Sequence, residues 1–277
     1  MAPLFVFSFE SEMWVNSFKA FIAFCFVSSS IYLINDCIDI NSDKKHPTKK
    51  YRIIASGQVS QKSATQLSLI LLIISLSIGF ILNNNVGFII ILYFLIQILY
   101  CFYIKNIPLI EFFCIASGFI LRSIAGGLSA NIIISPWFLL SIGMVSLFLA
   151  VEKRKAELLN IKTNKPLTRK VLKNYSLKLI NKFESVLSTC TVMTYSIWAY
   201  GPIIGGAKSS WMLITIPIVV LGVFRYQMLS ENGYEEDEYR FSKCIVETPE
   251  RIILNDKPMR IIIFSWILIT TLIGFVS

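Results

Sequence analysis

Three aspartates with regular spacing, Asp36, Asp39 and Asp43, are the residues of this chain that most directly predict chemistry. On a continuous α-helix, spacings of three and four residues place all three carboxylates on one face. Carboxylates so close together repel unless a cation lies among them, and oxygen ligands suit a hard divalent ion such as magnesium. Six lysines and arginines follow between Lys44 and Lys62. We therefore expect a metal-binding face that carries a phosphate-bearing substrate.

The elements that must position these aspartates are apolar. Hydrophobic residues make up 55% of the 277 residues, charged residues only 16%, and the mean hydropathy is +0.66. A transmembrane helix needs about 20 mostly apolar residues. Eight stretches meet this requirement: Met13–Ile34, Gln66–Leu82, Val86–Ile104, Ile107–Gly127, Ile133–Val151, Val186–Ile204, Trp211–Leu229 and Ile261–Val276.

Backbone groups in lipid must be satisfied within each segment, so these spans predict helices and an all-α, polytopic membrane bundle. With so many spans, we expect a single domain over residues 1–277. The apolar stretch Ala2–Phe9 is too short to cross a bilayer. We expect it to be the stub of a ninth span or a segment at the membrane interface.

Basic residues alternate strongly between the loops. Residues 41–63 hold six lysines and arginines and residues 152–184 hold ten, whereas residues 83–85 and 129–132 hold none. By the positive-inside rule the basic loops, and with them the aspartates, face the cytoplasm. We expect an integral plasma membrane protein whose net charge of +9 reflects topology and anionic ligands. Nucleic acid is not expected as a partner, since the charge is dispersed over one membrane face.

Several other charged residues lie at or near membrane depth. Lys105 could satisfy the end of a helix or bind an anion. Arg122 lies deeper, and we expect it to face a cavity. Lys153 and Glu157 could form an ordinary surface pair or belong to the site. Lysines alternate with apolar residues over Thr168–Leu187, which predicts an amphipathic helix along the membrane surface.

The run Asn35-Asp36-Cys37-Ile38-Asp39, with Asp43, resembles the first aspartate motif of the UbiA-type membrane prenyltransferases. A longer ordered set is similar to the decaprenyl-phosphate phosphoribosyltransferases within that superfamily. This set comprises His46-Pro47-Thr48-Lys49, Arg52, Ala55-Ser56-Gly57, Tyr100, Lys105, Leu121–Gly127, Lys153-Arg154, Ala156–Leu158, and Pro249-Glu250 ahead of Asp256. The resemblance extends from about Ala2 to Ile273.

This resemblance implies Mg²⁺-dependent transfer of 5-phosphoribose from phosphoribosyl pyrophosphate to a polyprenyl phosphate, with release of pyrophosphate. It implies a cavity between packed helices, open to the cytoplasm and sideways to lipid. By the same resemblance, Asp36 and Asp39 are the catalytic residues and bind magnesium together with Asp43. The substrate-binding residues it implies are Asn35, Asp43, Lys49, Arg52, Tyr100, Lys105, Arg122, Lys153, Arg154 and Glu157.

Two alternatives remain open. Aromatic prenyltransferases of the superfamily, which make quinone, haem or chlorophyll precursors, carry a second acidic motif where this chain has Glu152-Lys153-Arg154-Lys155. A basic stretch there favours a reaction that joins several anionic groups, and so favours phosphoribosyl transfer. Ile53 stands where relatives have proline, which we expect to loosen the loop without removing a ligand. The short amino terminus leaves an inactive or transport homologue as the other alternative. The oligomeric state is not predicted.

Overall fold

The computed structural model describes residues 10–44, 49–162, 170–232 and 255–276. The predicted stub at residues 2–9 and the motif residues 46–48 and 249–250 lie outside these ranges. The described residues form helices and no strand. The expected all-α class is thus confirmed.

Each of the eight predicted spans corresponds to a long helix. These helices are α2 (Ser11–Ile38), α4 (Gln61–Leu82), α5 (Asn84–Phe102), α6 (Ile110–Ser129), α7 (Pro136–Lys162), α8 (Leu177–Ala199), α9 (Ile216–Asn232) and α11 (Lys257–Val276). In the described part of the chain, seven helical segments are long and apolar enough to cross a membrane, and α8 is not among them. Short helices connect the long ones: α3 (Ile40–Asp43) and 3-10 turns at Lys49–Tyr51, Ile104–Asn106, Lys170–Asn174, Pro202–Ile204 and Ser210–Thr215.

The chain forms two compact units. The first is built mainly from residues 9–114 and 121–133, and the second mainly from residues 115–120 and 134–277. The aspartates Asp36, Asp39 and Asp43 belong to the first unit. The second contains the basic stretch that follows Val151.

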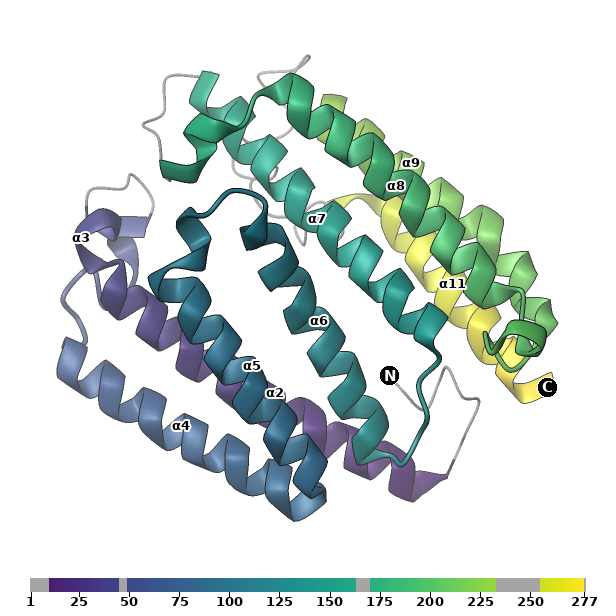
Figure 1. Ribbon diagram of the computed structural model, residues 1–277, viewed down its shortest axis with the longest axis horizontal. Helices are drawn as coiled ribbons and strands as arrows, with labels where there is room; N and C mark the ends of the chain where they lie inside the picture. The colour runs from purple at the N-terminus through teal and green to yellow at the C-terminus, as the bar shows by residue number, and fades with distance from the viewer. Residues whose placement is uncertain (1–9, 45–48, 163–169, 233–254, 277) are drawn as a thin grey trace. The chain divides into compact units, whose positions relative to one another are not determined.

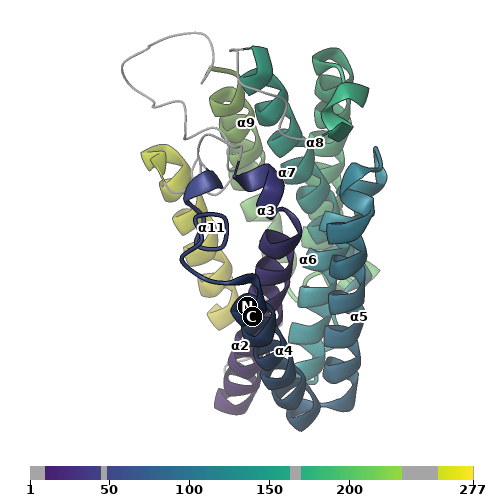
Figure 2. The ribbon, with the colours of Figure 1, turned by 90° about the vertical axis from the view of Figure 1, so that its left-hand side faces the viewer.

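In the first unit, α2 packs along α4 and α5 (Figure 1). Small and hydroxyl-bearing side chains allow the close approach, as is typical of helices in membranes. Ser75 Oγ of α4 donates a hydrogen bond to the carbonyl oxygen of Ala23 at 2.8 Å. At the α4–α5 turn, a Cβ on Gly79 would lie only 3.3 Å from the Cα of Gly87. The acidic α3 lies at the opposite end of α2 from this turn (Figure 2).

In the second unit, α8 packs against α7 and α9. The expected amphipathic helix along the membrane surface is wrong for the described part of Thr168–Leu187. A 3-10 turn ends at Asn174, and Ser176 then caps α8 by accepting a hydrogen bond from the Leu179 backbone N–H at 3.2 Å. Val171 and Leu172 are fully buried inside the protein. Their apolar side chains therefore stabilise the unit and do not contact lipid.

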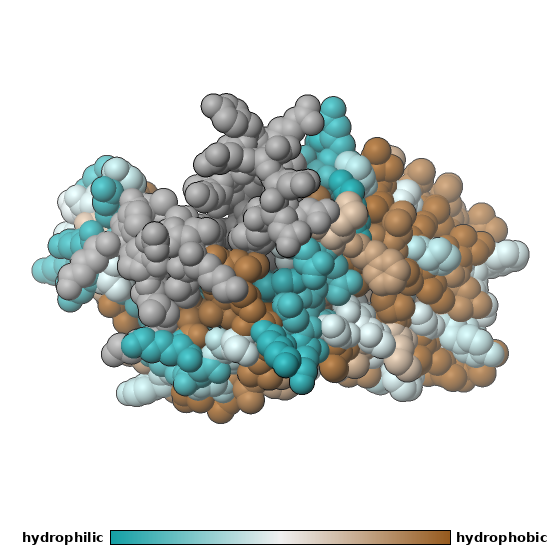
Figure 3. All heavy atoms as spheres, turned by 90° about the horizontal axis from the view of Figure 1, so that it is seen from above, coloured by the Kyte–Doolittle hydropathy of each residue, from teal (hydrophilic) through white to brown (hydrophobic). Residues whose placement is uncertain are grey.

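The helices of both units expose large apolar side chains, which cover much of the visible surface in Figure 3. Phe88 of α5 and Phe264 of α11 are exposed, for example. Together with the seven apolar segments, this surface is that of a multi-pass integral membrane protein.

Asp256, directly before α11, is bound by both Arg225 and the start of that helix. Arg225 Nε and Nη2 donate to its two carboxylate oxygens at 3.0 and 2.8 Å, and the Met259 backbone N–H donates at 2.9 Å. The hydrogen bonds from Arg225, followed by the one from Met259, lower the pKa of Asp256 below its usual 3.8. A carboxyl with a lowered pKa stabilises the fold above pH 3.8, and this contribution is lost as the pH falls.

We therefore predict that Asp256→Asn lowers the free energy of unfolding by about 1–3 kcal/mol at neutral pH, because Arg225 loses its charged partner. Between about pH 6 and pH 3, the variant should lose less thermal stability than the parent protein, since it lacks the titrating carboxyl. Thermal unfolding in detergent measures both effects. Parallel curves for the two proteins across this range would contradict the prediction.

Candidate functional site

The acidic stretch, Asp36–Asp43, does not lie on one unbroken helix. Helix α2 ends at Ile38, and Asp39 follows with φ −88° and ψ 4° before α3 begins. The carbonyl oxygen of Asp39 accepts hydrogen bonds from Ser42 Oγ at 2.7 Å and from the Asp43 backbone N–H at 2.9 Å. The expectation of one continuous helical face is therefore wrong, because the backbone at Asp39 departs from helical geometry between α2 and α3.

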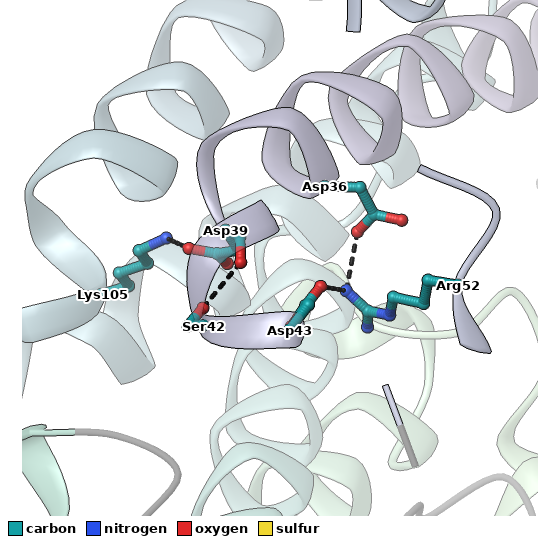
Figure 4. A network of polar contacts seen from close by, with 6 residues as sticks. All are labelled: Asp36, Asp39, Ser42, Asp43, Arg52 and Lys105. Atoms are coloured by element: carbon teal, nitrogen blue, oxygen red, sulfur yellow. Dashed lines mark hydrogen bonds and ion pairs between the residues drawn. The ribbon is translucent and has the colours of Figure 1, made fainter. Parts of the chain in front are cut away.

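Arg52 joins two of the three carboxylates. Its Nη1 donates to Asp36 Oδ1 at 2.7 Å and to Asp43 Oδ2 at 2.9 Å (Figure 4). Asp43 is buried, whereas Asp36 and Arg52 are each about a third exposed. One guanidinium thus bridges two acids at the end of an apolar helix and reduces their mutual repulsion.

The third carboxylate has a separate partner. Lys105, from the 3-10 turn after α5, places its Nζ 2.6 Å from Asp39 Oδ1 (Figure 4). Asp39 and Lys105 are 66 positions apart, so the fold and not the local sequence brings them together. This contact favours a role at the acidic site over simple capping of α5. Lys49 is also near enough to act electrostatically on Asp36.

The three carboxylates do not form a ready metal centre. Each is bonded to a cationic side chain of the protein. Across the described ranges, no group of three or more His, Cys, Asp or Glu side chains is placed to hold a metal ion. A divalent ion that bound these carboxylates would compete with Arg52 and Lys105 for them.

Two further predicted residues lie at neighbouring helix ends of the first unit. Asn35, in the last turn of α2, accepts a hydrogen bond on its carbonyl oxygen from the Asp39 backbone N–H at 2.9 Å. Tyr100, near the end of α5, packs against the apolar core of this unit. These contacts fix the helix ends from which Asp39 and Lys105 project.

Arg122 lies in the middle of α6 and is bound by two other helices. Its Nη2 donates to Tyr93 Oη of α5 at 2.5 Å and to Ser28 Oγ of α2 at 3.2 Å. Its guanidinium carbon also lies 4.9 Å from the centroid of the Tyr93 ring. Tyr93 and Ser28 could not be identified from the sequence, since a hydroxyl inside an apolar span gives no distinct signal. The cavity role of Arg122 stays a prediction.

Lys153, Arg154 and Glu157 lie on α7 in the second unit. Arg154 Nη1 contacts Glu157 Oε2 at 2.5 Å, and Arg154 is only 1% exposed. The acid at 157 therefore pairs with Arg154, three residues before it. The Arg154–Glu157 pair is largely buried, so Glu157 is not part of an ordinary surface pair.

Known proteins are similar in sequence to most of this chain. The model of the UbiA prenyltransferase family matches residues 2–245. A decaprenyl-phosphate phosphoribosyltransferase of Mycolicibacterium smegmatis is 33% identical over 255 residues, which are 90% of this chain and 77% of that protein. The protein of the same name from Corynebacterium glutamicum is 30% identical over 262 residues, or 94% and 76% of the two chains.

Among solved structures, a UbiA homolog from Archaeoglobus fulgidus bound to DMAPP and Mg²⁺ superposes with a TM-score of 0.72. The match covers 100% of this chain and 93% of that one at 16% identity. At this level of identity the likeness shows a common fold.

We predict that Tyr93→Phe destabilises the protein by about 1.5–3 kcal/mol, because a hydrogen bond to a charged group is lost while the ring under Arg122 is kept. Thermal unfolding in detergent would measure the change. Tyr103→Phe, which removes the hydroxyl of an exposed tyrosine, is the matched control and should have little effect. Equal stability of the two variants would contradict the importance of the Arg122 contact.

Proposed function

The chain belongs to the UbiA prenyltransferase family, and we propose that it transfers 5-phosphoribose from phosphoribosyl pyrophosphate to a polyprenyl phosphate, releasing pyrophosphate. Family membership and the named relatives make it a transferase. Those relatives, at 30–33% identity over most of their length, support the finer choice of substrates. The site is proposed to face the cytoplasm at the plasma membrane, as the basic loops predict.

The observation that carries the proposal is the gathering of cations on the acidic stretch. Arg52 and Lys105 reach Asp36, Asp43 and Asp39 from two other segments. A donor with a pyrophosphate and a 5-phosphate needs cations for its phosphate oxygens as well as acids for a metal. Both kinds of group are present in one part of the first unit.

Magnesium fits this site by the chemistry of its donors. The carboxylates of Asp36, Asp39 and Asp43 are hard oxygen ligands of the kind that Mg²⁺ binds, together with substrate phosphates. When bound, the ion would stabilise negative charge on the departing pyrophosphate. Arg52 and Lys105, released from the carboxylates, would then be available to the phosphate oxygens of the donor.

The residues of the chain act mainly by positioning. A phosphate oxygen of the lipid forms a bond to C1 of the ribose as the bond from C1 to the pyrophosphate oxygen breaks, and the leaving group keeps the electron pair. The lipid phosphate is already ionised, so no strong general base is needed. Lys49, Arg52 and Lys105 would hold the anionic groups in line and stabilise the charge that develops.

The basic stretch of α7 is proposed to serve the same reaction. Lys153 would contact a phosphate, and Arg154 could do so if it exchanged Glu157 for the substrate. Aromatic prenyl transfer is the less favoured function, because the stretch Glu152–Lys155 contains two lysines and an arginine where a second acidic motif would be needed.

We predict that membranes containing the protein consume phosphoribosyl pyrophosphate only when polyprenyl phosphate and Mg²⁺ are supplied. Asp36→Asn and Asp39→Asn should each lower kcat/KM by about a hundredfold or more, because a charge that stabilises the leaving group is lost. Mass spectrometry of the lipid product measures the rate. A prenylated aromatic product without phosphoribosyl transfer would refute the proposal, and unchanged rates would refute the assigned residues.

We also predict that Arg52→Gln tightens Mn²⁺ binding in the absence of substrate by roughly tenfold, which corresponds to about 1.4 kcal/mol. The reason is that Arg52 competes with a metal for Asp36 and Asp43. Electron paramagnetic resonance of free Mn²⁺ gives the affinity. Lys208→Gln removes one exposed positive charge elsewhere and serves as the control. Equal affinity of the two variants would show that Arg52 does not compete with the metal.

A further inference from the structure

Helix α8 buries one face in the second unit and leaves the opposite face uncovered. The buried face packs on α7 and α9 and includes Ile180, Glu184 and Ser188. The members of a second set follow one another at spacings of three or four residues, which places them on one side of a helix. All of them are exposed. This set, the outer stripe, comprises Lys178, Lys182, Val186, Thr189 and Met193.

The outer stripe changes in character along the helix. Its first two members are lysines, and its last three carry no charge. Val186 and Met193 are 61% and 57% exposed. Thr189 Oγ1 donates a hydrogen bond to the Ser185 carbonyl oxygen at 2.9 Å, so its hydroxyl is satisfied within the helix, as contact with lipid requires. Val186 is therefore the first residue of the stripe that suits the hydrocarbon of a bilayer.

The two lysines lie at the distance from Val186 that lipid headgroups would occupy. Since a helix rises about 1.5 Å per residue, Lys182 lies about 6 Å and Lys178 about 12 Å beyond Val186 along the axis. The headgroup layer is roughly 5–8 Å thick on each side of the hydrocarbon. A lysine can lay its long stem along apolar surface and place its ammonium group in this layer. Both ammonium groups can thus reach lipid phosphates.

No acid of the described ranges pairs with either lysine. Glu184, the acidic residue of α8, lies on the buried face and pairs with Lys155 at 2.6 Å. Lys178 and Lys182 are one turn apart, and like charges at this spacing destabilise a helix. An anion bound between them would relieve this repulsion. The outer stripe therefore joins an unmatched pair of cations to an apolar surface.

We propose that the outer stripe of α8 is a docking surface for anionic phospholipids. The ammonium groups of Lys178 and Lys182 bind the headgroup phosphates, and the acyl chains cover Val186 and Met193. A soluble anion matches only the basic part of the stripe, whereas an anionic phospholipid matches both parts. The bound lipid fixes the depth of α8 in the bilayer. This role goes beyond the proposed transfer reaction and does not depend on it.

Photo-crosslinking in lipid nanodiscs tests the proposal. A photoreactive benzophenone amino acid replaces Ser185, which is exposed and lies three residues after Lys182. The nanodiscs contain phosphatidylcholine with a minor share of phosphatidylglycerol, and mass spectrometry identifies the adducts. Adducts of phosphatidylglycerol should be enriched about fivefold over its share of the bilayer, because lysines near the surface attract anionic lipid. High salt should reduce this enrichment by screening the charges.

Charge variants show whether the enrichment comes from the stripe. In the Lys178→Gln/Lys182→Gln double variant, the adducts should return to the composition of the bilayer. The Lys62→Gln/Lys208→Gln double variant also removes two exposed positive charges, but outside α8, and should keep the enrichment. Equal enrichment in the two double variants would overturn the proposal, as would a parent protein without enrichment.

The identity of the adduct separates the other occupants. Crosslinks to a second copy of the chain would overturn the proposal. So would a dominant adduct of undecaprenyl phosphate when a small amount of this lipid is added, since the stripe would then be a site for a polyprenyl phosphate. The readout requires no transfer activity, so it tests this surface separately from the proposed reaction.

Discussion

One guanidinium shared by two carboxylates, that of Arg52 between Asp36 and Asp43, is the contact on which the acidic site depends. Three acids at the end of an apolar helix could not lie so close together without cations, because their mutual repulsion grows as water is excluded. Lys105 likewise stabilises the carboxylate of Asp39 by an ion pair. Since these cations come from other segments, the site forms only when the first unit has folded.

The ion pairs of the two units differ in how readily they can exchange. The side chains of Arg52 and Asp36 are 37% and 27% exposed, so water and an incoming anion can reach them. Those of Lys155 and Glu184 are 4% and 6% exposed, and breaking that pair would strand a buried charge. Exchangeable pairs suit the proposed binding of metal and pyrophosphate.

Hydropathy predicted seven of the long helices well, because lipid allows few alternatives to a helix at each apolar stretch. It placed α8 less well, since this helix begins at Leu177, before the predicted span Val186–Ile204, and is not apolar enough to count as a membrane span. The spacing of Asp36, Asp39 and Asp43 singled out a stretch on which cations gather in the structure. This spacing fits an unbroken helix equally well, so it did not predict the turn at Asp39. The contact of Asp39 with Lys105 spans 66 positions, and no local pattern encodes it. Tyr93 was missed for a similar reason, since its hydroxyl finds Arg122 only through tertiary packing.

We expect Arg52 and Lys105 to leave the aspartates for the phosphates when substrate binds. A structure determined with Mg²⁺ and phosphoribosyl pyrophosphate would show whether they do. We expect it to show the ion on oxygens of Asp36 and Asp39, with the Arg52 guanidinium and the Lys105 ammonium on phosphate oxygens of the donor. A donor bound elsewhere, with Arg52 still joining Asp36 to Asp43, would contradict this expectation.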